Sequence, residues 1–330
     1  MTTDQIKNIL HQNSFINKYK TAIQISAKVI VASGLLIYLI FAVNIQEILN
    51  AIEQADVFLL AAAFLLSYFN IFLQYYKWKI TANVMLQENQ NSKIWLSLFY
   101  GFSAGVFTPA RVGEYFGRAI VFKNRSLIRV SLATLLDKLF LLLIVLFFGS
   151  ISSILFIYYQ NHSAYYLTIG LFILLFALFY LFFWLIFNDW FWENILFTKL
   201  KKSKKLHWLF EKIKIFRKLD KKYATKMFLV SLILYVCILF QYAFLAAAFS
   251  NHIQYLEYFW AGNLMMFAKT IFPPVSLGEL GIREGASIFF ITQLGESAST
   301  GFNASIFLFF INVLIPAIMG LALLLKKSDD

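Results

Sequence analysis

Six apolar runs along the chain are long enough to form helices that cross a bilayer, which needs about 20 residues. They cover residues 23–43, 57–76, 139–158, 165–187, 226–249 and 302–325. The first run follows a polar, lysine-bearing lead and has the length of a spanning helix rather than of a signal-peptide core, so we expect it to be retained. The pattern predicts an all-α polytopic membrane protein in which residues 1–330 form a single integral membrane domain.

Two shorter apolar runs, 94–107 and 259–272, are each followed closely by a proline, Pro109 and Pro274. At the rise of an α-helix either run would be only about 21 Å long, whereas the hydrocarbon core is about 30 Å thick. Proline interrupts a helix, and glycine, charge and further apolar residues follow each break. We therefore expect two re-entrant hairpins, each of which enters the membrane part-way and returns to the side from which it came.

A shift of 165 residues aligns the two hairpins with each other. The seven matched pairs are Trp95/Trp260, Phe102/Phe267, Phe107/Phe272, Pro109/Pro274, Gly113/Gly278, Glu114/Glu279 and Arg118/Arg283. Coincidence in a biased composition is the alternative, but the matches fall at the same places in the helix order and favour duplication, with halves at about 23–158 and 165–325. Three crossings per half would invert the second half. The prediction is six spanning helices plus two re-entrant hairpins in an inverted-topology repeat, a recurrent transporter plan.

Composition agrees with a membrane protein, since 60% of the residues are hydrophobic and only 14% are charged, against about 25% charged in soluble domains. The formal net charge of +12 then indicates cytoplasmic loops and anionic lipid rather than nucleic acid. Lysine and arginine crowd the connection 188–225 and are absent from the predicted outer loops 159–164, 250–258 and 295–301. We expect a basic cytoplasmic connection and cytoplasmic N- and C-termini, provided that both hairpins return to their own side.

Within that connection, residues 199–222 hold many lysines, and Leu206 to Leu219 place apolar residues at helical spacing opposite the basic ones. This is typical of an interfacial helix on an anionic leaflet. An ordinary basic loop fits the residues equally well, and both interpretations stay open.

The hairpin breaks carry the candidate chemistry. A half-helix that begins after each break would present N–H groups and a partial positive charge, which suit an anion such as phosphate. Arg111, Arg118 and Arg283 would add guanidinium groups, which grip phosphate with two parallel hydrogen bonds. Lys269 lies just before the second break and could reach the same cavity. We expect Pro109, Gly113, Pro274 and Gly278 to shape the breaks.

The acidic residues have structural alternatives. Glu114 and Arg118, like Glu279 and Arg283, are four residues apart on one helix face, so each pair could simply neutralise itself. Glu284 could bind a cationic headgroup or carry a coupling proton, or it could be a cap or a loop salt bridge. For Asp137 and Lys138, at the start of the third spanning helix, we favour an interfacial ion pair over a functional one.

Signatures of catalysis and of metal or cofactor binding are not found in the sequence. It contains no Walker loop, no H-E-x-x-H and no G-x-S-x-G. The single cysteine, Cys237, excludes an intramolecular disulfide, and the four histidines do not form a metal-spaced pair. We expect neither a cofactor nor a metal, and favour a protein that is not an enzyme.

Several segments resemble the lysylphosphatidylglycerol synthase transmembrane family, which includes the flippase domain of the multiple peptide resistance factor. They are "TPARVGE" with "GRA", "SLATLLDKLF", "YYKWK" and "PPVSLGELGIREG". The second signature departs from the family at Leu277, commonly proline there, and at Glu279, commonly glycine, so its hairpin is expected to be less sharply broken. The chain lacks the soluble aminoacyl-transferase domain, and we expect no synthase activity.

What the resemblance implies is movement of a phospholipid or a polyprenyl-phosphate-linked lipid between the leaflets of a bacterial inner membrane. The leading hypothesis is thus a lipid flippase that binds a headgroup phosphate at Arg111, Arg118 and Arg283. One alternative is a membrane-embedded transferase that uses Glu114, Glu279 or Glu284 as acid–base groups. The other is a non-transporting partner of a glycosyltransferase. The sequence leaves the lipid, the direction, the energy source and any homo-oligomer undetermined.

Overall fold

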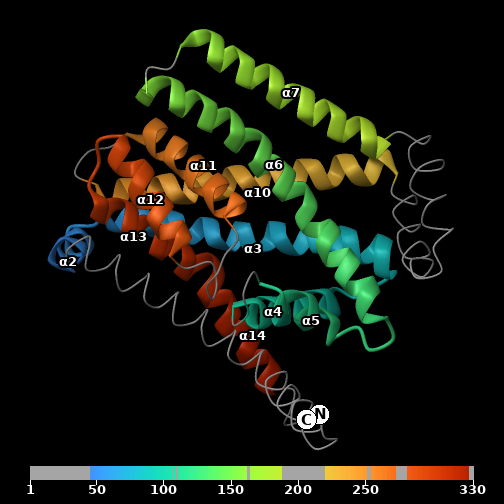
Figure 1. Cartoon of the computed structure of the whole chain (residues 1–330). Coiled ribbons are helices and arrows are strands. Elements are labelled where there is room, and N and C mark those ends of the chain that lie inside the picture. Colours follow the sequence, from blue (N-terminus) through green and yellow to red (C-terminus); the bar gives the residue numbers. More distant parts are fainter. Residues whose placement is uncertain are drawn as a thin grey trace, which may run out of the picture.

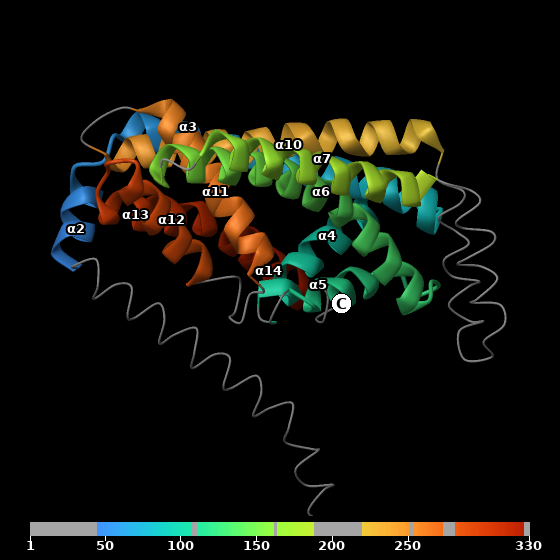
Figure 2. The same ribbon diagram turned by 45° about the horizontal axis from the view of Figure 1, so that its top comes forward.

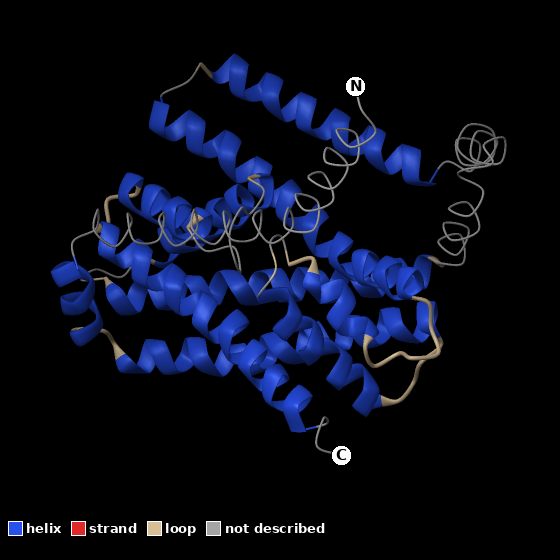
Figure 3. Cartoon of the chain, turned by 60° about the horizontal axis from the view of Figure 1, so that its bottom comes forward, coloured by secondary structure: helices blue, strands red, loops and turns tan. Residues whose placement is uncertain are grey.

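The structure is a computed structural model, and it describes residues 45–106, 108, 111–161, 164–187, 220–250, 254–272 and 281–326. In these ranges the regular secondary structure is helical throughout (Figure 3). This confirms the all-α prediction. Pro109, Pro274, Gly278 and Glu279 lie outside the described residues, as do the first apolar run at 23–43 and nearly all of the basic segment 199–222.

The helices follow one another along the chain as labelled in Figure 1. They are α2 (Ile45–Glu53), α3 (Val57–Leu86), α4 (Asn91–Val106), α5 (Gly113–Ala119), α6 (Leu127–Asn161), α7 (Tyr165–Phe187), α10 (Lys221–Phe249), α11 (Tyr255–Ile271), α12 (Ile282–Gln293), α13 (Ala298–Phe309), the π-helix η3 (Phe310–Leu314) and α14 (Ile315–Lys326).

Four helices in the described part of the chain are long and apolar enough to cross a membrane, and they make this a membrane protein. They are Val57–Leu86, Leu127–Gln160, Lys221–Phe249 and the continuous Ala298–Leu325. Each contains one of the predicted apolar runs and extends beyond it. The extensions of α3 and α6 carry the charged Lys77 and Asp137, which are buried against protein partners and therefore do not end the helix. The predicted run 165–187 forms α7 with the same bounds.

The first predicted hairpin is formed by α4 and α5, which pack against each other in opposite directions. A Cβ atom on Gly113 would lie 2.1 Å from the carbonyl oxygen of Ala104, and one on Gly117 would lie 2.3 Å from that of Tyr100. Only glycine allows the two backbones to approach so closely. The second short pair, α11 and α12, is also packed together, but the segment that joins it, 273–280, lies outside the described residues.

We therefore predict that Gly113→Ala opens this hairpin. The added methyl group overlaps the Ala104 carbonyl, and overpacking of this kind costs about 1–3 kcal/mol. The measurement is the free energy of unfolding of the purified protein in detergent. Gly170→Ala in α7 is the matched control, because a Cβ there meets nothing within 4 Å. Equal stability of Gly113→Ala and the wild type would show that the close approach is not required.

The packing of the two halves follows the same scheme. A long helix, two short helices and a long helical segment occur twice, as α3 to α6 and as α10 to α14. In both Figure 1 and Figure 2 the two leading long helices, α3 and α10, run side by side. The short α4 packs on α14 of the other half, and α11 packs on α6. Ser103 donates to the Ala317 carbonyl (2.6 Å), and Trp260 donates to that of Ser152 (3.3 Å). Each of these hydrogen bonds joins a short helix of one half to a long helical segment of the other half.

Large apolar side chains cover the outer surface. Phe58 on α3 is 88% exposed and Tyr180 on α7 is 74% exposed. In Figure 1, α7 lies at the upper edge of the molecule, where it packs on α6. A soluble monomer rarely exposes such a continuous apolar surface, so these residues are expected to face lipid.

Candidate functional site

A cavity of about 380 Å³ lies between the two halves of the chain. Side chains from α3, α6, α10, α11, α12 and the α13–η3 segment line it, together with α5 and the turn before it. Of the residues singled out in the sequence, it is lined by Arg111, Glu114, Arg118, Asp137, Lys138, Lys269 and Arg283. The structure thus brings the charged residues of both hairpin regions together around one space.

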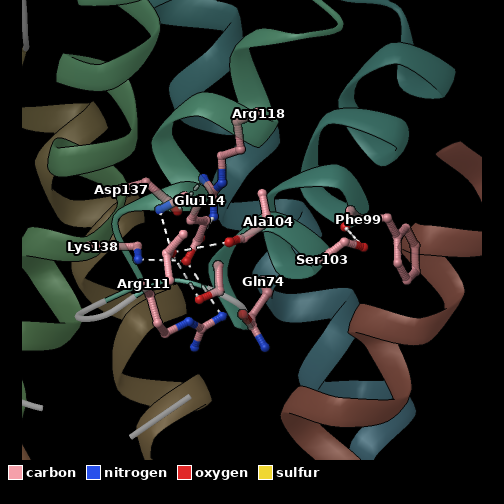
Figure 4. A network of polar contacts seen from close by, with 12 residues as sticks. Gln74, Phe99, Ser103, Ala104, Arg111, Glu114, Arg118, Asp137 and Lys138 are labelled. Carbon is pink, nitrogen blue, oxygen red and sulfur yellow. Dashed lines mark hydrogen bonds and ion pairs between the residues drawn. The ribbon is translucent and has the colours of Figure 1, made fainter. Parts of the chain in front are cut away.

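Glu114 on α5 is the centre of a buried charge network (Figure 4). Its Oε1 accepts from Arg118 Nη2 (2.6 Å), and its Oε2 accepts from Lys138 Nζ (2.6 Å). Arg111 Nη2 lies 3.5 Å from the same Oε2. Glu114 lies outside the four spanning helices. Burial alone would raise its pKa, but the positive charges of Lys138, Arg118 and Arg111 lower the pKa well below its ordinary value. The carboxylate is therefore ionised and fully engaged.

Asp137 on α6 extends this network. Arg118 Nη1 donates to Asp137 Oδ2 at 2.9 Å, and Lys77 Nζ lies 3.9 Å from Oδ1. The Arg118 guanidinium also stacks on Trp78, with its Cζ 4.3 Å from the ring centroid. Glu114, Arg118 and Asp137 are each at most 3% exposed. The predicted pair Glu114–Arg118 is formed, but the interpretation of Asp137 and Lys138 as an ion pair with each other is wrong, because each holds a different residue of α5.

Arg111 has a strained backbone. Its φ angle is +53°, in the left-handed region that non-glycine residues adopt at a cost of about 1–3 kcal/mol. The turn around it is held by Thr108, whose Oγ1 accepts from the Gly113 N–H at 2.6 Å. The Nε atoms of Arg111 and Arg118 are buried and have no hydrogen-bond partner among the described residues. Strain and unsatisfied buried donors together are typical of a ligand site.

Arg283 on α12 reaches the cavity from the other half. It donates to Glu284 Oε1 and, through Nε, to Ser305 Oγ at 3.1 Å, and it stacks on Phe309. Glu284 is fully buried behind it and accepts from the Gly281 N–H, so it caps α12 and does not line the cavity. The contacts of Glu284 therefore support its interpretation as a helix cap and not as a headgroup-binding residue.

Several N–H groups at the starts of α5 and α12 already have hydrogen-bond partners within the protein. At α5 the Gly113 N–H donates to Thr108, and the Glu114 N–H donates to the Arg111 carbonyl oxygen. At α12 the Gly281 N–H is taken by Glu284. These three N–H groups are therefore not available to an anion. The positive charge of the site comes from side chains instead.

Charge is strongly unbalanced around the cavity. Among the described lining residues six are basic, namely Lys77, Arg111, Arg118, Lys138, Lys269 and Arg283, and two are acidic, namely Glu114 and Asp137. Even with the carboxylate of Glu284 behind Arg283, these side chains leave an excess of positive charge. Such a cavity is suited to an anion.

Carboxamides that the sequence analysis did not single out line another part of the same cavity. Asn70 Nδ2 donates to Gln241 Oε1 (3.0 Å), Gln74 Nε2 donates to Asn70 Oδ1 (2.7 Å), and Asn312 Nδ2 donates to Gln241 Oε1 (2.9 Å). Asn70, Gln74 and Asn312 face the cavity. Lys77 was missed as well. The available signal was their position, because polar residues inside apolar spans are costly and usually functional.

The chain as a whole matches the profile of a family described as the lysylphosphatidylglycerol synthase TM region, over residues 25–320. The chain belongs to this family. The match includes both hairpin regions and every residue that lines the cavity. The resemblance predicted from the sequence is thus confirmed. A comparison with curated proteins gave no match. Membership relates this membrane protein to lipid-modifying or lipid-flipping proteins.

Proposed function

We propose that the protein is a lipid flippase that binds a phosphate-bearing headgroup in the central cavity, while the acyl chains stay in the bilayer. The observation that carries the proposal is the cavity itself, with six basic and two acidic described residues on its wall. The guanidinium groups of Arg111 and Arg118 line the cavity from one half of the chain, and Arg283 lines it from the other half. Guanidinium groups bind phosphate in a forked, charge-assisted arrangement.

The membrane arrangement proposed with this function has six spanning helices, two re-entrant hairpins and halves of opposite orientation. Support comes from the repeated helix order and from the packing of the short helices, since α4 packs on α14 of the other half and α11 packs on α6. Inverted repeats that meet at a central site underlie alternating access. We place the protein in a bacterial inner membrane with both termini cytoplasmic, where residues 199–222 would contact anionic lipid.

Transport accounts for the site better than the two alternatives. A transferase would use a carboxylate as acid or base, but Glu114 and Asp137 are each held by at least two cations, which disfavours proton exchange. A scaffold for a glycosyltransferase would need no charged interior, and the cavity is lined with arginine and lysine. A membrane phospholipid or a polyprenyl-phosphate lipid fits the charge.

The proposal is tested in vesicles that contain labelled anionic lipid. We expect the wild-type protein to exchange the lipid between leaflets, and the double variant Arg118→Ala/Arg283→Ala to do so at least about tenfold more slowly, since each lost charged hydrogen bond contributes about 1.5–3 kcal/mol. Monodisperse elution of the variant in detergent controls for folding. Equal exchange by the two proteins would exclude this phosphate site.

A further inference from the structure

The cavity has two chemically different walls. One wall is cationic, with Arg111, Arg118 and Lys138 around Glu114. The other, called the carboxamide wall, is the group of neutral polar side chains Asn70, Gln74, Asn312 and Thr270, and the further cations Lys77, Lys269 and Arg283 line the rest of the cavity. A phosphate group at the first wall would place whatever is esterified to it within reach of the second.

The carboxamide wall has unused hydrogen-bonding capacity. A carboxamide carries two N–H donors and an oxygen with two lone pairs. Gln74 is described with one hydrogen bond, donated to Asn70, and Asn312 exchanges hydrogen bonds only with Gln241 among the described residues. Groups that can both donate and accept are suited to hydroxyls, which do the same.

A cationic headgroup has no matching partner on the described walls. Glu114 is held by Arg118, Lys138 and Arg111, and Asp137 by Arg118 and Lys77. An ammonium group would have to displace one of these cations while it enters a cavity of the same sign. The charge of the described lining residues therefore disfavours choline, ethanolamine and aminoacyl headgroups.

We infer that the flippase site prefers a net-anionic lipid phosphate whose headgroup is uncharged and bears hydroxyls. The inference rests on the proposed function and names its substrate class. The phosphate lies against Arg111 and Arg118, and the hydroxyls bond to Gln74, Asn70 and Asn312. At about 380 Å³ the cavity is at the small end of the range of about 300–1,000 Å³ for ligand sites. It fits a headgroup and its phosphate rather than a whole lipid.

The headgroup preference is tested by measuring the exchange rates of lipids that share the same acyl chains and differ only in the headgroup. Vesicles containing the protein receive labelled phosphatidylglycerol, phosphatidylethanolamine, phosphatidylcholine or lysyl-phosphatidylglycerol. We expect phosphatidylglycerol to exchange at least about tenfold faster than the other three. A further arm with a polyprenyl-phosphate sugar distinguishes the two sources of this chemistry, since the faster of it and phosphatidylglycerol identifies the lipid class.

Substitution of Gln74 alone should change the headgroup preference if the carboxamide wall binds the headgroup. Gln74→Leu removes hydrogen bonds, and we expect the ratio of phosphatidylglycerol to phosphatidylcholine exchange to fall several-fold. Gln74→Glu adds a carboxylate of the same shape, and we expect the ratio of lysyl-phosphatidylglycerol to phosphatidylglycerol exchange to rise. Gln293→Leu, at the exposed end of α12, is the matched control and keeps the wild-type ratios.

Two failures are distinguishable. Exchange of all four phospholipids at one rate, with ratios unchanged in both Gln74 variants, would overturn the inference and leave lipid transport intact. Absence of exchange for every lipid, the polyprenyl arm included, would overturn the proposed function itself. Faster exchange of lysyl-phosphatidylglycerol than of phosphatidylglycerol by the wild type would also contradict the inference.

Discussion

Glu114→Gln is expected to cost about 3–5 kcal/mol of folding stability, the usual effect of breaking a buried ion pair on one side. The glutamine keeps the shape of the side chain but removes the charge that Arg118, Lys138 and Arg111 share. Only Asp137 would then remain to compensate the cations of this wall. Because both Glu114 and Arg118 are 2% exposed, water cannot replace the lost partner. The measurement is the free energy of unfolding in mixed detergent micelles.

Glu53→Gln is the matched control, because Glu53 is exposed at the end of α2 and surface substitutions usually stay within about 0.5 kcal/mol. A second variant, Glu114→Gln with Arg118→Met, removes both charges of the closest pair. We expect it to be more stable than the sum of the two single changes predicts, because the pair couples them. A stable Glu114→Gln protein, or additive effects, would show that the network does not hold the hairpin.

The four long helices and α7 were predictable because apolar runs indicate burial in lipid or protein, whereas α2 lies outside every predicted run. The short helices α4 and α11 could also be predicted, from length and from the prolines that follow. The extent of α3 and α6 could not, because Lys77 and Asp137 are charges that end an apolar run in the sequence but not a helix in the fold. Their burial depends on partners from elsewhere in the chain, which no local pattern reveals.

The site was predictable in its residue types and not in its pairings. Arg118 and Arg283 were recognisable because charge beside a helix break is costly in a membrane. Arg283 pairs with its sequence neighbour Glu284, whereas the separate partners of Asp137 and Lys138 follow from the packing of α5 on α6. The positive φ of Arg111 likewise has no sequence signal, since glycine is the residue that such a position usually takes.

Arg111→Gly is therefore expected to be at least as stable as the wild type and to transport at least about tenfold more slowly, the loss of one charged hydrogen bond of about 1.5–3 kcal/mol. Relief of strain contributes about 1–3 kcal/mol, and the greater freedom of glycine in the unfolded chain offsets about 0.5–1 kcal/mol. The lost contact with Glu114 is long, at 3.5 Å, and Arg118 and Lys138 still hold that carboxylate. Removing one of several crowded cations also lowers their mutual repulsion.

Opposite signs for stability and transport would separate a binding role of Arg111 from a structural one, since a purely structural residue would lose both together. The two measurements are unfolding in detergent and exchange of labelled anionic lipid in vesicles. Arg111→Lys keeps the charge and the backbone strain but loses the guanidinium geometry that allows two parallel hydrogen bonds, so we expect a transport rate between those of the wild type and Arg111→Gly. Lys123→Ala, which removes one exposed cation from the loop after α5, is the control and should match the wild type in both measurements. If Arg111→Gly transports at the wild-type rate, the strained arginine does not bind the headgroup, and the phosphate must lie nearer to Arg283 on α12.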